Sequence, residues 1–169
     1  ASIARASRSN CEGWMDAQEF KDRLLRTIHN KDNPYHPLVW INGDPQIGEG
    51  TYIGGFSEVN AKGARVTIGR GCDIASFVAI NAADSHRMCL GLAQHNTLLD
   101  IEIGDCVFIG SHSAVLGGSV VGHHSVIAAG TVVRAGDIPP FSLVVGNPAS
   151  VKPGYYRAEY EAMHGPWTG

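Results

Sequence analysis

Apolar residues recur every six positions along the second half of the chain. The residues on this spacing are Ile103, Ile109, Val115, Val121, Ile127, Val133, Pro139, Val145 and Val151. An α-helix would repeat its apolar positions every three or four residues, and an alternating strand every two. A period of six instead predicts very short strands joined by regular corners, with three such units in each triangular coil. Stacked coils place each aliphatic side chain above its equivalent eighteen positions earlier, so the sequence predicts a parallel β-helix.

The same period occurs earlier in the chain in two other phases. The residues that carry it are Ile47, Ile53, Val59, Ile68, Ile74 and Ile80. Ile80 and Ile103 are 23 positions apart, which is not a multiple of six, so part of the chain must leave the coil between them. Long excursions from a rigid scaffold are a usual place for functional residues. We therefore expect a β-helix over residues 45–152 with an external loop over residues 82–100.

Helical patterns flank the predicted β-helix. An amphipathic helix is expected over residues 14–30, with Asp16 as its N-cap. Its apolar face carries Phe20, Leu24, Leu25 and Ile28. A second, short helix is expected over residues 155–164. Both are predicted to cap the open ends of the β-helix, and the chain is expected to form a single domain over residues 1–169.

Composition narrows the classes of function. The formal net charge of −3 over 169 residues gives no basic surface for nucleic acid or an anionic membrane. No stretch approaches the ~20 apolar residues of a membrane span, and residues 1–30 contain charges where a signal peptide would be apolar. We therefore predict a cytoplasmic protein. The four cysteines include no CxxC pair and are expected to be small, reduced side chains, with no metal site.

Three segments resemble a known family. They are residues 80–88 (INAADSHRM), residues 103–111 (IGDCVFIGS), and residues 127–133 together with 145–149. Across Pro45 to Arg157 the chain is similar to the hexapeptide-repeat acyltransferases, especially the sugar O-acetyltransferases, nucleotide-sugar N-acetyltransferases and antibiotic-inactivating (xenobiotic) acetyltransferases. The resemblance implies a left-handed β-helix that uses acetyl-CoA, without a metal, in a homotrimer with active sites between subunits.

The chemistry of acetyl transfer suggests roles for particular residues. A base must take the proton of the acceptor, and donors must stabilise the oxyanion that forms on the carbonyl. His86 is the candidate base, because an unperturbed imidazole exchanges protons near pH ~6.5 and the resemblance places the family's catalytic histidine there. The resemblance also points to a backbone N–H around Gly110 and Ser111 as the oxyanion donor. His112, His123 and His124 are expected to be exposed turn residues.

Binding residues follow from the same resemblance. Coenzyme A is expected along a groove between two subunits, with phosphate contacts from basic residues of the last coils. The predicted cofactor-binding residues are Gly110, Ser111, Ala129, Gly130, Arg134, Asn147 and Lys152. The predicted substrate-binding residues are Ser57, Asn60, Asn81, Asp84 and Arg87. The expected acceptor is the hydroxyl or amino group of a sugar, either nucleotide-linked or a polysaccharide precursor.

Two alternatives belong to other classes. A γ-class carbonic anhydrase would need three histidines that converge on one zinc ion, and His112 and His123 are not spaced in that way. A non-catalytic structural β-helix would have no need for the external loop with His86 or for the Asn147–Pro148 turn.

Overall fold

The computed structural model describes residues 16–28 and 32–168, in two compact units, 1–32 and 33–169. In the first unit, helix α1 spans Ala17–Thr27. The Asp16 carboxylate caps it by accepting hydrogen bonds from the amides of Gln18 and Glu19 at 2.8 and 3.0 Å. The helix is therefore shorter than the predicted 14–30, of which residues 14, 15, 29 and 30 lie outside the described residues. The single domain over 1–169 stays a prediction.

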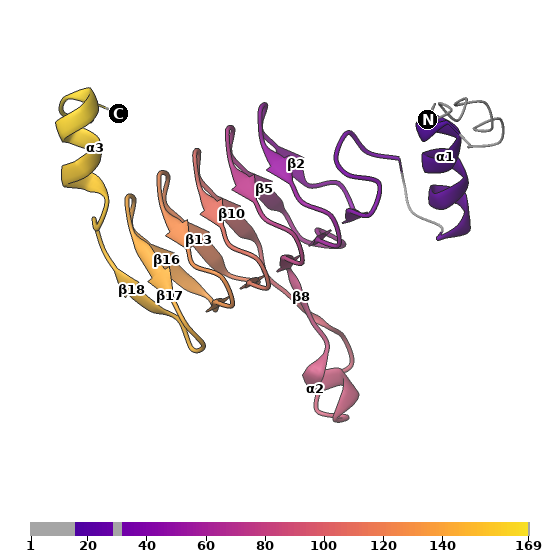
Figure 1. The fold of residues 1–169 in the computed structure, drawn as a ribbon. Helices are drawn as coiled ribbons and strands as arrows, with labels where there is room; N and C mark the ends of the chain where they lie inside the picture. Colours follow the sequence, from indigo (N-terminus) through magenta and orange to yellow (C-terminus); the bar gives the residue numbers. More distant parts are fainter. Residues whose placement is uncertain (1–15, 29–31, 169) are drawn as a thin grey trace, which may run out of the picture. The chain divides into compact units, whose positions relative to one another are not determined.

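The second unit is a solenoid of short strands in three sheets (Figure 1). Sheet A contains β1 (Trp40–Asn42), β4 (Glu58–Asn60), β7 (Ala79–Asn81), β12 (Ala114–Leu116) and β15 (Val132–Val133). Sheet B contains β2 (Gln46–Ile47), β5 (Val66–Ile68), β10 (Ile101–Ile103), β13 (Ser119–Val121) and β16 (Gly136–Ile138). Sheet C contains β3 (Tyr52–Ile53), β6 (Asp73–Ile74), β11 (Phe108–Ile109), β14 (Val126–Ile127), β17 (Leu143–Val145) and β18 (Ser150–Lys152). The predicted parallel β-helix is confirmed.

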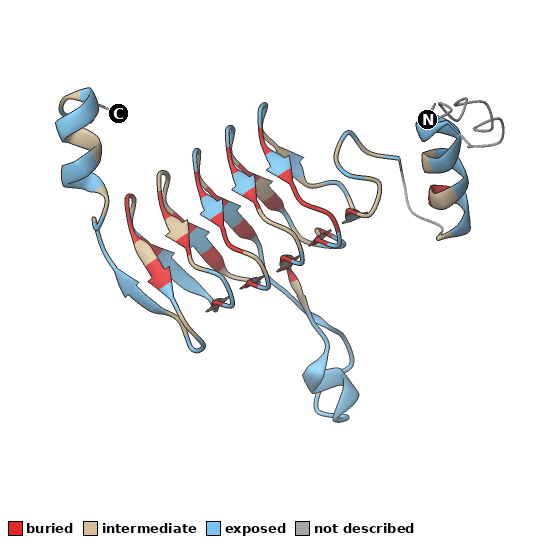
Figure 2. Cartoon of the chain, in the orientation of Figure 1, coloured by how far each residue is buried: buried red, intermediate tan, exposed pale blue. Residues whose placement is uncertain are grey.

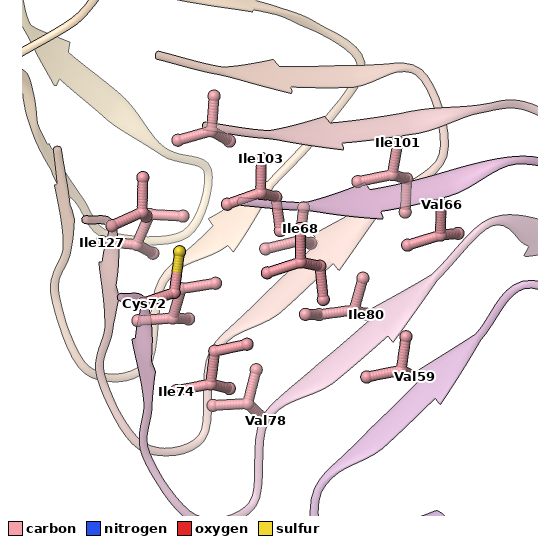
Figure 3. Packing of buried hydrophobic residues seen from close by; sticks show 14 of the residues in the cluster. Val59, Val66, Ile68, Cys72, Ile74, Val78, Ile80, Ile101, Ile103 and Ile127 are labelled. Atoms are coloured by element: carbon pink, nitrogen blue, oxygen red, sulfur yellow. The ribbon is translucent and has the colours of Figure 1, made fainter. Parts of the chain in front are cut away.

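The aliphatic positions of the six-residue grid form the core of the solenoid. Ile109, Val115 and Ile127 have no exposed surface, and Figure 3 shows such side chains stacked inside the coils. The registers match the prediction, since Ile103 pairs with Val121 eighteen positions later. Each buried Val or Ile contributes on the order of 1.5–3 kcal/mol relative to an exposed one. Stacked aliphatic side chains therefore hold successive coils together.

The solenoid departs from the predicted grid at both ends. It begins at Trp40 rather than at residue 45, because β1 pairs with β4 in parallel. After Val133 the turn into β16 is one residue shorter, so Val121 pairs with Ile138, only seventeen positions away. The core therefore uses Ile138 and Val144. The predictions for three grid residues were wrong: Pro139, Val145 and Val151 are not buried. Val151 lies in β18, which runs antiparallel to β17.

The external loop leaves the solenoid between β7 and β10. It contains β8 (Ala83–Asp84), helix α2 (His86–Cys89) and β9 (Thr97–Leu98), with β8 and β9 paired antiparallel. In Figure 1 the loop projects from the stack of coils, and in Figure 2 its helix is exposed. After the solenoid, helix α3 spans Arg157–His164, two residues shorter than predicted. Within the described part of the chain, no helix is long and apolar enough to cross a membrane.

Candidate active site

Strand β8 places a carboxylate beside the candidate base. The Asp84 Oδ1 atom accepts a hydrogen bond from the His86 amide at 2.9 Å and lies 2.6 Å from His86 Nδ1. The backbone hydrogen bond from His86, followed by the side-chain one, lowers the pKa of Asp84. An ionised carboxylate can only accept, so Nδ1 carries the proton and Nε2 of the neutral ring keeps its lone pair. This arrangement orients His86 as a base, and both side chains are exposed to solvent.

Asp84 was predicted as a substrate-binding residue, and the structure gives its carboxylate another partner. The side chains of Asn60 and Asn81 also make hydrogen bonds within the fold. Asn60 Nδ2 donates to Asn81 Oδ1 at 3.2 Å, and the same oxygen accepts from the Ala83 amide at 3.0 Å. These contacts hold the base of the external loop. Arg87 lies exposed in α2 next to His86.

Ser57 does not line a surface that a substrate could reach. Its side chain is buried, donates to the Ala75 carbonyl at 3.0 Å and accepts from the Val78 amide at 3.1 Å. Buried hydroxyl groups with both roles satisfied stabilise the stacking of coils. We therefore remove Ser57 from the candidate site.

Most of the predicted cofactor-binding residues share one edge of the solenoid. We call this edge the CA corner: the turns from sheet C to sheet A over residues 54–57, 75–78, 110–113 and 128–131, with the final turn 146–149. Its last three turns contain Gly110, Ser111, Ala129, Gly130 and Asn147. Hydrogen bonds link these turns, since the Gly130 amide donates to the Ser111 carbonyl at 2.9 Å and Gly146 donates to Thr131 Oγ1 at 3.1 Å.

Two glycines of the CA corner serve different purposes. A Cβ atom at Gly110 would lie 2.5 Å from the Ala129 nitrogen, so this position needs close approach of two backbones. Gly130 has φ +70° and open space around it.

The Gly110 amide donates to the Ile127 carbonyl at 2.8 Å, so the coil already uses this amide and it is not free to bind an oxyanion. In the described residues the Ser111 amide has no acceptor, so Ser111 is the better candidate for the oxyanion donor.

Arg134 and Lys152 lie away from the CA corner. Arg134 follows β15 in the turn from sheet A to sheet B. Lys152 pairs with Leu143 at the opposite end of the strand from that corner, and its Nζ lies 5.8 Å from the centre of the Tyr155 ring. The structure therefore does not bring these two cations together with the other predicted cofactor residues.

The CA corner also carries an aromatic ladder that sequence reasoning missed. The Phe56 and Phe77 rings stack with centroids 5.0 Å apart at 6°, and Phe77 stacks on His112 at 4.9 Å and 13°. All three residues adopt positive φ, between 61° and 63°. Each stands three residues after a buried isoleucine of the grid, and this shared position is the signal that sequence reasoning could have used. His112 is exposed, as predicted, but it is also stacked.

A different corner borders a cavity whose lining extends from Glu49 to Trp167. The turn after β13 places His123 and His124 against Trp167, beside a cavity of about 800 Å³. His123 Nδ1 lies 2.9 Å from His124 Nδ1. Burial is the main cause that lowers the pKa of both imidazoles. This cluster lies on the turn from sheet B to sheet C, apart from both His86 and Ser111.

His86 and Ser111 lie at opposite ends of the strands of sheet A. The loop with His86 follows β7, whereas Ser111 precedes β12, which pairs with β7. Strands of three residues span about 10 Å. A single copy of the chain therefore does not bring the candidate base and the candidate oxyanion donor together.

Residues 100–135 match the family described as Bacterial transferase hexapeptide (six repeats). This range includes the turns with Ser111 and Gly130 and leaves out His86. The six-residue repeats of this part of the chain therefore match those of a known family.

Relatives and solved structures agree with this match. The bifunctional protein GlmU of Streptococcus equi subsp. zooepidemicus is 33% identical over 129 residues, which cover 72% of this chain and 27% of GlmU. The hexapeptide-repeat acetyltransferase VCA0836 of Vibrio cholerae, solved with acetyl-CoA, has a TM-score of 0.62 at 27% identity and covers 82% of this chain and 78% of its own. The polySia-specific acetyltransferase NeuO has a TM-score of 0.57 at 31% identity, with 69% of this chain and 57% of its own covered. These findings confirm the resemblance to hexapeptide-repeat acetyltransferases.

Two facts limit what can be carried over to this chain from its relatives. The chain spans about a quarter of the length of the curated relatives it matches first. Among residues 16–28 and 32–168, no three His, Cys, Asp or Glu side chains are arranged to hold a metal ion. His112 and His123 lie on different corners, so within one chain nothing favours the carbonic anhydrase alternative.

Proposed function

We propose that the protein transfers the acetyl group of acetyl-CoA to a hydroxyl or amino group of a sugar. The observation that carries this proposal is the His86–Asp84 pair on an external loop of a hexapeptide-repeat β-helix. Two similar structures support it: NeuO is described as a polySia-specific acetyltransferase, and VCA0836 was solved in complex with acetyl-CoA. A sugar that is nucleotide-linked, or that enters a polysaccharide, is the acceptor class we infer.

The geometry suggests direct transfer. His86 Nε2 takes the proton of the acceptor as its oxygen or nitrogen attacks the thioester carbonyl. The Ser111 amide donates to the oxyanion of the tetrahedral intermediate. When the intermediate collapses, the C–S bond breaks and the proton passes from His86 to the departing thiolate, which leaves as coenzyme A. Asp84 keeps the His86 ring in the tautomer that this sequence of steps requires.

We infer that coenzyme A runs along the CA corner, past Ser111, Ala129 and Gly130, toward the Asn147 turn. Arg134 and Lys152 remain the proposed phosphate partners, from surfaces outside this corner. Because one copy separates His86 from Ser111, the proposal requires a homotrimer in which His86 of one copy faces the CA corner of the next. Arg87, next to His86, is the proposed contact to the acceptor from the loop.

The test is acetyl-CoA-dependent release of thiol in the presence of free and nucleotide-linked sugars. His86→Ala is expected to lower turnover roughly 10²- to 10⁴-fold, the usual contribution of a general base. His95→Ala is the matched control, because His95 is exposed on the same loop outside α2. Turnover that is unchanged in His86→Ala would remove His86 from its role. Absence of both turnover and coenzyme A binding in the wild type would contradict the proposed function and favour a non-catalytic structural β-helix.

A further inference from the structure

The aromatic ladder of the CA corner ends in an empty position. Phe77 covers one face of the His112 ring. On the other side the next coil has Gly130, which adopts the same positive φ as the three ladder residues, at +70°. A Cβ atom at Gly130 would have no neighbour within 4 Å. As far as residues 16–28 and 32–168 show, the fourth position of the ladder is therefore available, next to the exposed residue His112.

This empty position adjoins the proposed oxyanion donor. Ser111 immediately precedes His112, and its carbonyl accepts the Gly130 amide at 2.9 Å. A ring placed on His112 above Gly130 would lie beside an acetyl group bound at the Ser111 amide. The group next to the acetyl carbonyl in a direct transfer is the acceptor.

We propose that His112 is the stacking platform for the ring of the acceptor and that Gly130 keeps space for that ring. The ligand class is a ring with an apolar C–H face, as a pyranose presents. This inference rests on the proposed function. Coil spacing and two phenylalanines hold the imidazole in place before binding, so little side-chain entropy is lost when a ring stacks on it. The flexible pantetheine chain has no flat face that would use this platform.

Two substitutions at one position separate stacking from imidazole chemistry. His112→Ala is expected to raise the KM for the acceptor roughly three- to tenfold, the range of an aromatic pair, while the KM for acetyl-CoA stays unchanged. His112→Phe is expected to restore the wild-type KM, because Phe56 and Phe77 adopt the same backbone conformation in the same corner. If His112→Phe is as impaired as His112→Ala, the platform is overturned and the imidazole itself is required.

The second experiment fills the empty position. Gly130→Phe would extend the ladder by one ring, in a backbone conformation that phenylalanine already adopts twice in this corner. It is expected to abolish transfer to the pyranose while coenzyme A, which is proposed to contact the main chain at Gly130, still binds. Gly50→Phe is the matched control, since Gly50 has φ +73° on the turn from sheet B to sheet C and a Cβ there would meet no atom closer than 3.9 Å. Transfer by Gly130→Phe with an unchanged acceptor KM would overturn the proposal.

A matched pair of acceptors tests the requirement for a ring. His112→Ala is expected to affect a hexopyranoside more than the corresponding open-chain alditol, which presents no ring face. Equal effects on both would overturn the stacking role, as would loss of subunit assembly in His112→Ala, which would make the ladder a contact between copies. If the wild type transfers acetyl groups and His112→Ala changes nothing, only this inference fails. If the wild type acetylates no sugar, the proposed function fails with it.

Discussion

The Asp84 carboxylate receives two hydrogen bonds from one residue, from the backbone amide and from the ring of His86. The residue between them, Ser85, makes a tight turn at the start of α2, so the pair is formed locally and needs no distant element. A locally formed pair can keep its geometry on an exposed loop. Its exposure leaves His86 accessible to a substrate, which in the proposed homotrimer another copy of the chain would hold.

Asp84→Asn tests this pair. An asparagine oxygen can still accept from the His86 amide, but it no longer stabilises the charge that forms on the ring when the base takes a proton. We expect kcat to fall roughly ten- to hundredfold, as for partners that orient catalytic ligands, with both KM values unchanged. Steady-state kinetics measure this. Asp73→Asn, on the exposed face of β6, serves as control, and a fall confined to KM would argue that Asp84 binds substrate instead.

The elements show which parts of the fold the sequence could predict. The grid predicted the coils because each of its central residues is aliphatic and buried. It failed after Val133 because Ile138 and Val144 stand next to Pro139 and Val145, so apolar residues occupy both possible registers. The candidate base came from resemblance. The eighteen-residue repeat does not reveal the ladder, because Phe77 and His112 are 35 positions apart across the external loop, and only their shared position three residues after a grid isoleucine connects them.

The C-terminal segment is an element whose attachment should depend on pH. Trp167 stacks on His123 at 4.7 Å, and Tyr160 contacts His124 at 4.9 Å. Burial lowers the pKa of both imidazoles. Arg157 lowers that of His123 further, His123 and His164 lower that of His124, and Asp105 opposes the shift in each. The folded state therefore binds fewer protons than the unfolded chain, so the stabilisation is complete above pH ~6.5 and is lost as the pH falls below it.

We expect faster amide hydrogen exchange in α3 at pH 5 than at pH 7.5, after correction for the intrinsic effect of pH. Exchange monitored by mass spectrometry on peptides covering residues 157–168 measures it. His124→Phe should reduce the difference, because Phe141 shows that a phenylalanine fits this corner with positive φ. Equal protection at both pH values would show that the histidines do not control this segment.

For the whole molecule, the separation of His86 from the CA corner implies that a complete active site needs residues from two copies of the chain. If each site takes its base from one copy and its corner from the next, a chain that is defective in one of the two can still contribute the other. Such a site cannot form in an isolated 18.0 kDa chain. Activity then depends on protein concentration wherever the assembly dissociates.

Mixing two inactive variants tests this arrangement. His86→Ala lacks the base, and Gly130→Phe blocks the corner. Subunits exchanged at equal ratio are expected to recover about a quarter of wild-type turnover, since half of the bases and half of the corners are intact and combine at random. The double variant, carrying both changes in one chain, should stay inactive in the same mixing protocol. Failure of the mixture to recover activity, with exchange verified by mass spectrometry, would place each site within a single chain.

The antiparallel strand β18 has a consequence for self-association. Every coil before it offers parallel strands on which another identical coil could stack, and solenoids with such open ends can add copies end to end. By reversing direction, β18 covers the sheet C edge of the last coil with a strand whose hydrogen-bonding groups do not match a further parallel coil. β18 thus blocks the end-to-end addition of another copy at this edge of sheet C. Shortening the chain before Ser150 is expected to expose an edge suited to growth into filaments.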